Sequence, residues 1–513
     1  MSELSDIIKH NLDQRQTQTV LRDIARDQDF TGNDVLSAQD TLARRLRDIG
    51  IQAGDLILLS LPNSAANITV QLTAFDLDVV VQTINPNMPT AELRTTMAQH
   101  HFAAMILNEV HARALPEIEA TSDLHFVHET GTLLGSDFTL AAARNQQVGN
   151  PLLDQLNATG QSPLGVLMYT SGSSGHPKAV ALNHAQLLAA ASEIARTQQL
   201  TTADKTLLVM PLFHINAQVI TVLATLVSGG SIAIAPKFSA SHFWQQVRDN
   251  QITWVSAAPA IIAILLKTKP LSAPQVPHLR FIRSASAPLL PTVQTAFERD
   301  FGIPIQQAYG MTEGASQITF NPLGATKAGS VGKSGGTAIS IQDENGRQLA
   351  QGATGEICLR GDHIITAYLD PSLQDDFGNG WFRSGDVGHL DADGYLFIDG
   401  RKKELINRGG DKISPVAIEN VLITHPDVRN IAVFGMPDPV YGERVAAAVI
   451  PEADAPSATD LAQSLRAYAT QRLARFEVPT DIYFTDSLPA GATGKIQRRR
   501  VRDQITTQHV AAN

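Results

Sequence analysis

The chain has 513 residues, of which 43% are apolar and 18% are charged, and these proportions are ordinary for a folded globular protein. At roughly 100 to 200 residues per domain, the length predicts about three domain-sized units and excludes a short binding module. The formal charge of −10 disfavours a nucleic-acid binder, because contacts with phosphates need a basic surface.

The chain lacks the usual sequence signals for export or for a membrane. Its first residues are polar and charged, without the apolar stretch of a signal peptide. The most apolar stretches, 219–227 and 255–266, are shorter than the roughly 18 to 20 residues that span a bilayer. The single cysteine, Cys358, cannot form an intramolecular disulfide. We therefore expect a cytoplasmic protein without a membrane partner.

Apolar strands and amphipathic helices alternate in the first part of the chain. The pattern predicts strands at 56–60, 79–81 and 103–107 and helices at 64–75 and 90–99. Buried strands separated by helices predict a parallel, doubly wound sheet. A polar, Gln- and Asn-rich stretch at 144–163 is typical of a loop that joins this run to the next.

A second run of the same kind begins after Asn183. The Asn183 side chain can cap a helix together with Gln186 at the third helical position. Leu187, Ala191 and Ile194 then form one apolar face, which predicts a helix packed on a second sheet.

The last part of the chain has a different character. Glycines and short apolar strands indicate β-rich structure at 329–400, and strands at 430–435 and 445–450 with a helix at 461–476 indicate a compact α+β unit. We therefore predict an α/β protein. Residues 1–400 would form a large N-terminal domain of two doubly wound β/α subdomains and a small β-rich subdomain, and residues 401–513 a small α+β C-terminal domain.

The strongest local signal is the loop at 169–178, which reads YTSGSSGHPK and follows the apolar run 165–168. Hydroxyls, glycines, exposed backbone N–H groups and the cation of Lys178 can form a cradle for phosphate. The loop is not a common P-loop, because no Gly-Lys-Ser/Thr stands at the required spacing. Taken alone, its composition also fits a Ser/Gly-rich hairpin loop.

This loop resembles the first signature of the adenylate-forming enzymes, the group of acyl-CoA synthetases, luciferases and peptide-synthetase adenylation domains. Later motifs of that family follow in the same order. They are 309–313 (YGMTE), 355–356 (GE), 380–386 (GWFRSGD), 400–403 (GRKK), 407–412 (NRGGDK) and 494–496 (GKI). Together the motifs span roughly residues 165 to 500, so the resemblance covers most of the chain.

The resemblance implies a site for ATP and Mg²⁺. The β- and γ-phosphates would be held by Thr170, Ser171, Gly172, Ser173, Ser174, Gly175 and Lys178. Thr312 would contact the α-phosphate, and Glu313 would hold Mg²⁺, a hard cation that prefers carboxylate and phosphate oxygens. Tyr309 would stack on adenine, Asp386 would accept from the ribose hydroxyls, and Arg401 would reach the ribose and phosphate.

The resemblance also implies a catalytic lysine and a mobile C-terminal domain. Lys495 would stabilise the negative charge that builds up as a carboxylate attacks the α-phosphate. Lys403 stands at the family's hinge position, and the glycine loop Gly409 and Gly410 would line the tunnel for coenzyme A. The arginines that follow the lysine at 498, 499, 500 and 502 fit either a solvated face or the attraction of coenzyme A phosphates.

Within the family, the sequence is most similar to the oxalate–CoA ligase branch. The segments that carry this likeness are 238–244, 279–286, 403–410 and 495–500. The candidate residues for the acid pocket are His214, Arg283, Ser284, Ser286 and the backbone near Gly310. A small dianion needs hydrogen-bond donors and a cation rather than an apolar slot, and these residue types can supply them.

The expected reaction has two steps. A carboxylate and ATP give an acyl-adenylate and pyrophosphate, and coenzyme A then gives the thioester and AMP. Three alternatives remain open at this point. The acid could be another short-chain, dicarboxylic or aryl acid, the acceptor could be a carrier protein acting in trans, or the chain could bind nucleotide without turnover.

Overall fold

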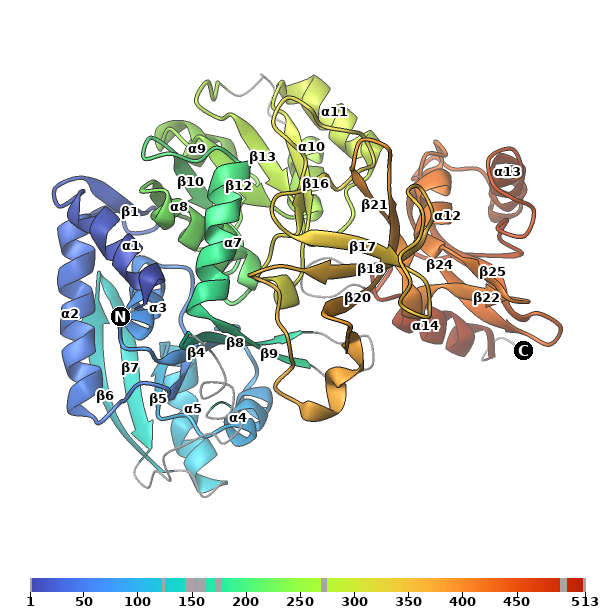
Figure 1. Ribbon diagram of the computed structural model, residues 1–513. Helices are drawn as coiled ribbons and strands as arrows, with labels where there is room; N and C mark the ends of the chain where they lie inside the picture. Colours follow the sequence, from blue (N-terminus) through green and yellow to red (C-terminus); the bar gives the residue numbers. More distant parts are fainter. Residues whose placement is uncertain are drawn as a thin grey trace.

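Figure 1 shows the computed structural model, which describes residues 2–121, 125–143, 153, 162–170, 178–268, 275–489 and 496–510. Four sheets organise these residues. The sheet at one end of the molecule, drawn in orange to red in Figure 1, belongs to the C-terminal part of the chain, and the N-terminal elements lie at the other end. In the described ranges, no helix combines the length and apolarity that a membrane span needs.

The seven-stranded sheet has the strand order β6-β7-β5-β3-β4-β8-β9. Its strands are β3 (Leu56–Ser60), β4 (Val80–Thr83), β5 (Ala104–Leu107), β6 (Phe126–Leu133), β7 (Ser136–Ala143), β8 (Leu164–Thr170) and β9 (Lys178–Asn183). Its helices are α2 (Gly32–Asp48), α3 (Ala65–Asp76), α4 (Thr90–Gln99) and α5 (Glu109–Ala120). The central strands β5, β3, β4 and β8 are parallel, as the alternation of strands and helices predicted, and antiparallel strands close both edges.

The nine-stranded sheet has the order β16-β15-β14-β13-β12-β10-β11-β1-β2. Its strands are β1 (Thr19–Asp23), β2 (Gln28–Thr31), β10 (Lys205–Leu208), β11 (Ser231–Ile234), β12 (Trp254–Ala257), β13 (Phe281–Ser284), β14 (Ile305–Tyr309), β15 (Thr319–Phe320) and β16 (Lys333–Ser334). The strands from β1 to β14 in this order are parallel, as predicted for a second doubly wound unit. The sequence did not predict that β1 and β2 complete its far edge.

Helices and helical turns surround this second sheet. They are α1 (Glu3–Asp13), α7 (His184–Thr197), the π-helix η1 (Asn216–Leu223), α8 (Ala224–Val227), α9 (Phe243–Asp249), α10 (Pro259–Lys267) and α11 (Pro291–Phe301). The predicted cap of α7 is confirmed, since the Gln186 amide donates to Asn183 Oδ1 at 2.8 Å and the Asn183 amide donates to Gln186 Oε1 at 2.9 Å. This reciprocal pair satisfies two amide groups at the start of the helix and fixes where α7 begins.

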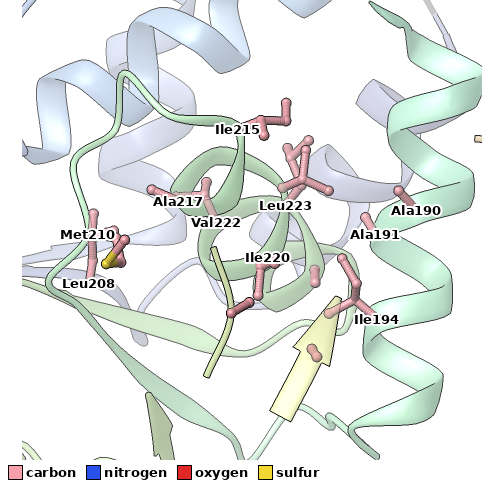
Figure 2. Close-up of a cluster of buried hydrophobic side chains, with 14 of the residues drawn as sticks. Ala190, Ala191, Ile194, Leu208, Met210, Ile215, Ala217, Ile220, Val222 and Leu223 are labelled. Atoms are coloured by element: carbon pink, nitrogen blue, oxygen red, sulfur yellow. The ribbon is translucent and has the colours of Figure 1, made fainter. Parts of the chain in front are cut away.

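The apolar face of α7 packs against η1. Figure 2 shows Ala191 and Ile194 of α7 on the side that faces Ile220 and Leu223 of η1, and all four side chains are buried. Fully burying one Leu or Ile side chain contributes about 1.5 to 3 kcal/mol, so this contact holds η1 firmly beside the sheet. The first residue of η1, Asn216, belongs to the polar cluster described below.

A third sheet and a fourth sheet follow along the chain. The third contains β17 (Ala338–Gln342), β18 (Gly355–Arg360), β19 (Phe377–Gly378), β20 (Trp381–Leu390) and β21 (Leu396–Arg401), with the 3₁₀ turns η2 (Thr312–Gly314) before it and η3 (Pro371–Asp376) within it. The fourth contains β22 (Ile406–Arg408), β23 (Asp411–Ile413), β24 (Val428–Asp438), β25 (Gly442–Pro451) and β26 (Asp481–Phe484). Its helices are α12 (Pro415–Leu422), α13 (Ala458–Thr470) and α14 (Arg498–Val510).

The short turn η4 (Lys402–Glu404) joins the third sheet to the fourth. The strand β21 ends at Arg401 and β22 begins at Ile406, so the change of sheet falls close to the predicted boundary after residue 400. The two domains stay a prediction. The helix expected at 461–476 is shorter than predicted, because α13 ends at Thr470.

Candidate active site

The segment predicted to bind phosphate follows β8 and precedes β9 in the sequence. Ser171, Gly172, Ser173, Ser174 and Gly175 lie outside the described residues, as does Lys495. The two ends of the loop are described. Thr170 and Lys178 are register partners in the antiparallel pair, and Thr170 Oγ1 donates to the Lys178 carbonyl at 3.5 Å. The two ends of the segment therefore lie on an antiparallel β-hairpin, and the phosphate cradle stays a prediction.

The Lys178 side chain contacts the segment that joins β18 to β20. Its ammonium forms an ion pair with Asp376 of η3 and lies 3.4 Å from the Tyr368 hydroxyl and 4.5 Å from the centre of the Tyr368 ring. Neither partner was predicted, because no local pattern marks them. These contacts hold the base of the loop against the third sheet.

Glu313 lies next to this group in η2. The Tyr368 hydroxyl donates to Glu313 Oε1 at 3.1 Å, and burial raises the pKa of the Glu313 carboxyl. Thr312 starts the same turn. Tyr368 therefore connects two predicted ATP-site residues, Lys178 and Glu313, that are 135 positions apart in the sequence.

The described residues fit a magnesium ion that is held mainly by substrate. They contain no group of three or more His, Cys, Asp or Glu side chains that could hold a metal by themselves. Mg²⁺ is usually bound by one or two carboxylates together with substrate phosphates, and it keeps several waters. The carboxylate of Glu313, which Tyr368 links to Lys178 at the end of the loop, could supply one such ligand.

Tyr309, Asp386 and Arg401 form a second connected group. The Tyr309 hydroxyl donates to Asp386 Oδ2 at 2.6 Å, and Arg401 Nε lies 2.9 Å from Asp386 Oδ1. Asp386 and Arg401 are register partners on β20 and β21. Burial and the neighbouring Asp386 raise the pKa of Tyr309, and the charge of Asp386 raises the pKa of Arg401. The structure thus brings three predicted nucleotide-site residues into contact.

Gly310 follows Tyr309 and cannot carry a side chain. A Cβ atom at this position would lie 1.4 Å from the backbone oxygen of Ser316. Ala315 and Ser316 have φ angles of 43° and 96°, so the chain turns back sharply here and passes directly over Gly310. Because the neighbour is backbone and not a flexible side chain, the close approach requires glycine.

Arg283 is the most unusual buried residue of the predicted acid pocket. It lies on β13, its exposed fraction is 0%, and all three guanidinium nitrogens lack a hydrogen-bond partner among the described residues. Burial lowers the pKa of Arg283 to about 9. A buried, unpaired cation is costly, and ionisable groups with strongly shifted pKa values are concentrated at functional sites.

Polar side chains occur on the same face of the sheet as Arg283. Ser256 is its register partner on β12, and register partners on neighbouring strands share a face. Ser256 Oγ donates to Asn216 Oδ1 at 3.1 Å, and Asn216 Nδ2 donates to Ser286 Oγ at 3.3 Å. Ser256 and Asn216 were not predicted to belong to the pocket. Each is a polar residue within a mainly apolar stretch, which is the pattern that could have indicated them.

The structure does not bring every predicted pocket residue to this cluster. Ser284 directly follows Arg283 on β13, so its side chain points to the opposite face of the sheet, where Gln307 of β14 is its register partner. His214 lies before η1 and is half-buried beside Phe213, with 4.4 Å between ring centres. Burial lowers the pKa of His214, so the ring is neutral near pH 7.

The glycines predicted for the coenzyme A tunnel form a tight turn. Gly409 and Gly410 join β22 to β23 and have φ angles of 63° and 102°. Two-residue hairpin turns of this kind need positive φ at both positions, so the turn by itself accounts for both glycines. Lys403 is exposed in η4. The roles of these residues in coenzyme A binding and as a hinge stay predictions.

The arginines after Lys495 have different environments. Arg499 and Arg500 are exposed, which agrees with a solvated face. Arg498 is only 12% exposed and is paired with Glu404 and Glu419. The run is therefore not one uniform surface patch.

Comparison with known proteins identifies the family. A family described as AMP-binding enzyme matches residues 8–369, and one described as AMP-binding enzyme C-terminal domain matches residues 417–495. A protein named oxalate–CoA ligase from Arabidopsis thaliana is 36% identical over 478 residues, which are 91% of this chain and 90% of the relative. A protein named sulfoacetate–CoA ligase from Cupriavidus necator is 35% identical over 474 residues, 90% of each chain.

A likeness in structure agrees with the likeness in sequence. The ATP-bound crystal structure of MatB from Rhodopseudomonas palustris has a TM-score of 0.85, is 23% identical and covers 98% of both chains. At that identity the likeness concerns the fold. Three findings agree: the two family matches, the relatives along nine-tenths of the chain and the shared fold. The chain therefore belongs to the AMP-binding enzyme family, as an enzyme of the adenylate-forming CoA ligase type.

Proposed function

We propose that this enzyme is an AMP-forming CoA ligase for a small acid that carries a second anionic group, with oxalate as the best candidate. In the first step, a carboxylate oxygen of the acid attacks the α-phosphorus of ATP and pyrophosphate leaves. In the second step, the sulfur of coenzyme A attacks the acyl carbon of the adenylate and AMP leaves.

The proposed roles of the nucleotide-site residues follow from their chemistry. Asp386 already accepts from Tyr309, and a carboxylate has further lone pairs that can accept from the ribose hydroxyls. Lys178 and the phosphate loop would hold the β- and γ-phosphates. Glu313 would hold Mg²⁺, which supplies positive charge at the phosphates when it is bound. Lys495 would stabilise the charge that develops during attack on the α-phosphorus.

The single observation that carries the proposal on the acid is the unpaired Arg283. An anion on the substrate can accept two parallel hydrogen bonds from a guanidinium and so compensate the buried charge. A monocarboxylic acid uses its only carboxylate in the reaction and leaves this arginine unpaired. Discrimination by such buried polar groups reaches about 10⁴-fold, far more than an apolar pocket achieves by size.

The names of two relatives agree with this chemistry. Oxalate and sulfoacetate, the acids in their names, are both small and carry a second anionic group. A relative from Mycobacterium tuberculosis with 29% identity is named a long-chain-fatty-acid–CoA ligase, so the names of the relatives do not all indicate a small acid. The charge at Arg283 favours the small dianions.

AMP formation tests the proposal. The purified protein is given ATP, Mg²⁺ and coenzyme A together with oxalate, malonate, acetate, a medium-chain fatty acid or benzoate, and the variant Lys495→Ala is measured in parallel. We expect the highest kcat/KM with oxalate and a loss of about 10²- to 10³-fold in the variant.

Each other outcome has a defined meaning. Turnover with a monoacid alone would contradict the assignment of the acid and keep the ligase. Thioester formation on a phosphopantetheinylated carrier protein but not on coenzyme A would change the acceptor. No pyrophosphate release with any acid would refute the proposed reaction.

A further inference from the structure

Tyr368 has a hydroxyl that contacts two groups of opposite charge. It donates its single proton to Glu313 Oε1 at 3.1 Å, and it accepts from the Lys178 ammonium, whose nitrogen lies 3.4 Å away. Among the described residues, Lys178 forms its ion pair with Asp376 and not with Glu313. The hydroxyl therefore joins the two charged side chains through one oxygen atom, in the order ammonium, phenol, carboxylate.

The backbone on both sides of Tyr368 is bonded to the elements that carry these two charges. The N–H of Ile365 donates to the Glu313 carbonyl in η2 at 2.9 Å. The N–H of Leu369 donates to the Ala179 carbonyl on β9 at 3.2 Å. Ile365 and Leu369 are both buried. This short segment therefore fixes η2 and the start of β9 relative to each other.

The ring of Tyr368 is held as firmly as its backbone. Tyr368 is only 3% exposed. Phe377 and Phe382 pack edge-on against its ring, with 5.4 and 6.3 Å between ring centres. Edge-to-face contacts at these distances are a favoured geometry for aromatic pairs. Packing of the ring therefore fixes the position of the hydroxyl.

Stability alone is a weak explanation for this link between two charges. Removing charged groups from water costs free energy, and apolar side chains of similar volume often stabilise a fold equally well. A fixed separation between a cation and a carboxylate matters more to a ligand that has to meet both. Under the proposed function that ligand is ATP with Mg²⁺, since Lys178 would contact phosphate oxygens and Glu313 would contact the metal.

We propose that Tyr368 is a positioning residue that sets the Lys178 ammonium and the Glu313 carboxylate at a fixed separation for ATP and Mg²⁺. The proposal rests on the proposed roles of those two residues. The ammonium and the carboxylate polarise the phenol O–H bond in the same direction, which strengthens both hydrogen bonds. Charged groups that are already in place need no rearrangement when a ligand binds, so Tyr368 should tighten the binding of nucleotide together with Mg²⁺.

Binding of an unreactive nucleotide measures this role without turnover. The probe is α,β-methylene-ATP, and its Kd is measured by calorimetry with and without Mg²⁺. Tyr368→Phe removes only the hydroxyl and keeps the ring. We expect the Kd with Mg²⁺ to rise by about 10-fold or more, the usual effect of losing a hydrogen bond to a charged group. Without Mg²⁺ the Kd should rise less, because Glu313 then has no metal to bind.

Two further variants show whether the effect passes through Glu313. In the Glu313→Gln background, Tyr368→Phe should cause little additional loss, because both changes then act through one group. Tyr395→Phe is the matched control. Tyr395 lies directly before β21, is also buried, and donates its hydroxyl to the Ala325 carbonyl at 2.5 Å. This control should lower thermal stability about as much as Tyr368→Phe and leave the Kd unchanged.

The Mg²⁺ dependence of ATP–pyrophosphate exchange gives a second readout. In Tyr368→Phe, the Mg²⁺ concentration for half-maximal exchange should rise by about the same factor as the Kd, and saturating Mg²⁺ should restore most of the exchange rate. A purely structural defect would instead lower the maximal rate and leave the Mg²⁺ concentration for half-maximal exchange unchanged.

The outcomes separate this inference from the proposed function. An unchanged Kd in Tyr368→Phe, or an equal rise in Tyr395→Phe, would overturn the positioning role. A full further loss in the Glu313→Gln background would also overturn it, because Tyr368 would then act through another group. Unchanged binding of nucleotide and Mg²⁺ by Glu313→Gln would instead refute the proposed role of Glu313. Absence of exchange in the unsubstituted protein would refute the proposed reaction, and the binding measurements would still decide the role of Tyr368.

Discussion

Replacing Arg283 with methionine removes a buried charge at nearly constant volume. Burial lowers the pKa of Arg283 from the ordinary value of an arginine to about 9. At about 1.4 kcal/mol for each pKa unit, this difference corresponds to a penalty of several kcal/mol in folding free energy. Because the folded-state pKa is the lower one, the full penalty acts at every pH below about 9 and declines only as the pH rises from there toward the pKa of the unfolded chain.

The variant should therefore be more stable than the unsubstituted protein when no acid is bound. We expect a gain of about 1 to 4 kcal/mol at pH 7, the range found when buried charges are replaced by apolar side chains of similar size. Thermal unfolding in the absence of substrates measures it. Arg280→Met is the matched control, since Arg280 is partly exposed and pairs with Asp204 at 2.7 Å, and this change should lower stability.

The same variant should lose its preference for dianions. Under the proposed function, Arg283 would donate charge-assisted hydrogen bonds to the second anionic group, at about 1.5 to 3 kcal/mol each, so we expect kcat/KM for oxalate to fall by at least about 10²-fold. The value for acetate should change little. A variant that is less stable than the unsubstituted protein and still prefers oxalate would refute the reasoning, because Arg283 would then have a partner inside the protein.

The remaining predictions concern backbone space and pH. Gly310→Ala places a Cβ 1.4 Å from the Ser316 backbone oxygen, so AMP formation should fall by more than about 10²-fold and thermal stability should drop. Gly378→Ala is the control, because nothing lies within 4 Å of the added atom. It should change the free energy of unfolding by less than about 0.5 kcal/mol. Burial raises the pKa of Glu193 from 4.5 to about 7. The cost of burying its ionised carboxylate therefore does not lower stability below pH 4.5 and lowers it fully above pH 7. Glu193→Gln should therefore match the unsubstituted protein in thermal unfolding at low pH and exceed it by up to about 3 kcal/mol above pH 7. A stability difference between Glu193→Gln and the unsubstituted protein that stays constant from pH 5 to pH 8 would contradict the raised pKa of Glu193.

Local sequence patterns were sufficient for many elements of the fold. The strand expected at 56–60 is β3 to the residue, and the cap expected at Asn183 starts α7. Such features depend on periodicity and on side chains within one turn of each other, so they can be predicted without knowing the tertiary structure. The ordered motifs also predicted the family, which the comparisons confirm, whereas the roles of the nucleotide-site residues stay predictions.

Long-range pairing decided what the sequence could not. The strand β1 at 19–23 joins a sheet formed mainly by residues 205–309 and lies between β11 and the edge strand β2. Its residue Leu21 pairs with Ile232, which is more than 200 residues away. The same limit applies to Tyr368, which joins Lys178 to Glu313. No local pattern specifies which distant segment meets another, because that choice depends on the packing of complete elements.

The sequence by itself determined the chemistry that this protein can offer. The motifs placed a lysine, a carboxylate and a phosphate loop in one chain, and the comparisons confirm the family that this combination indicates. Only the tertiary structure decided which charges are paired. Arg498 and Arg283 are both arginines in motif-rich segments, yet one is bound by two carboxylates and the other is buried with unpaired nitrogens. Burial and partners are properties of the assembled fold, and they determine the cost of a charge and therefore its function.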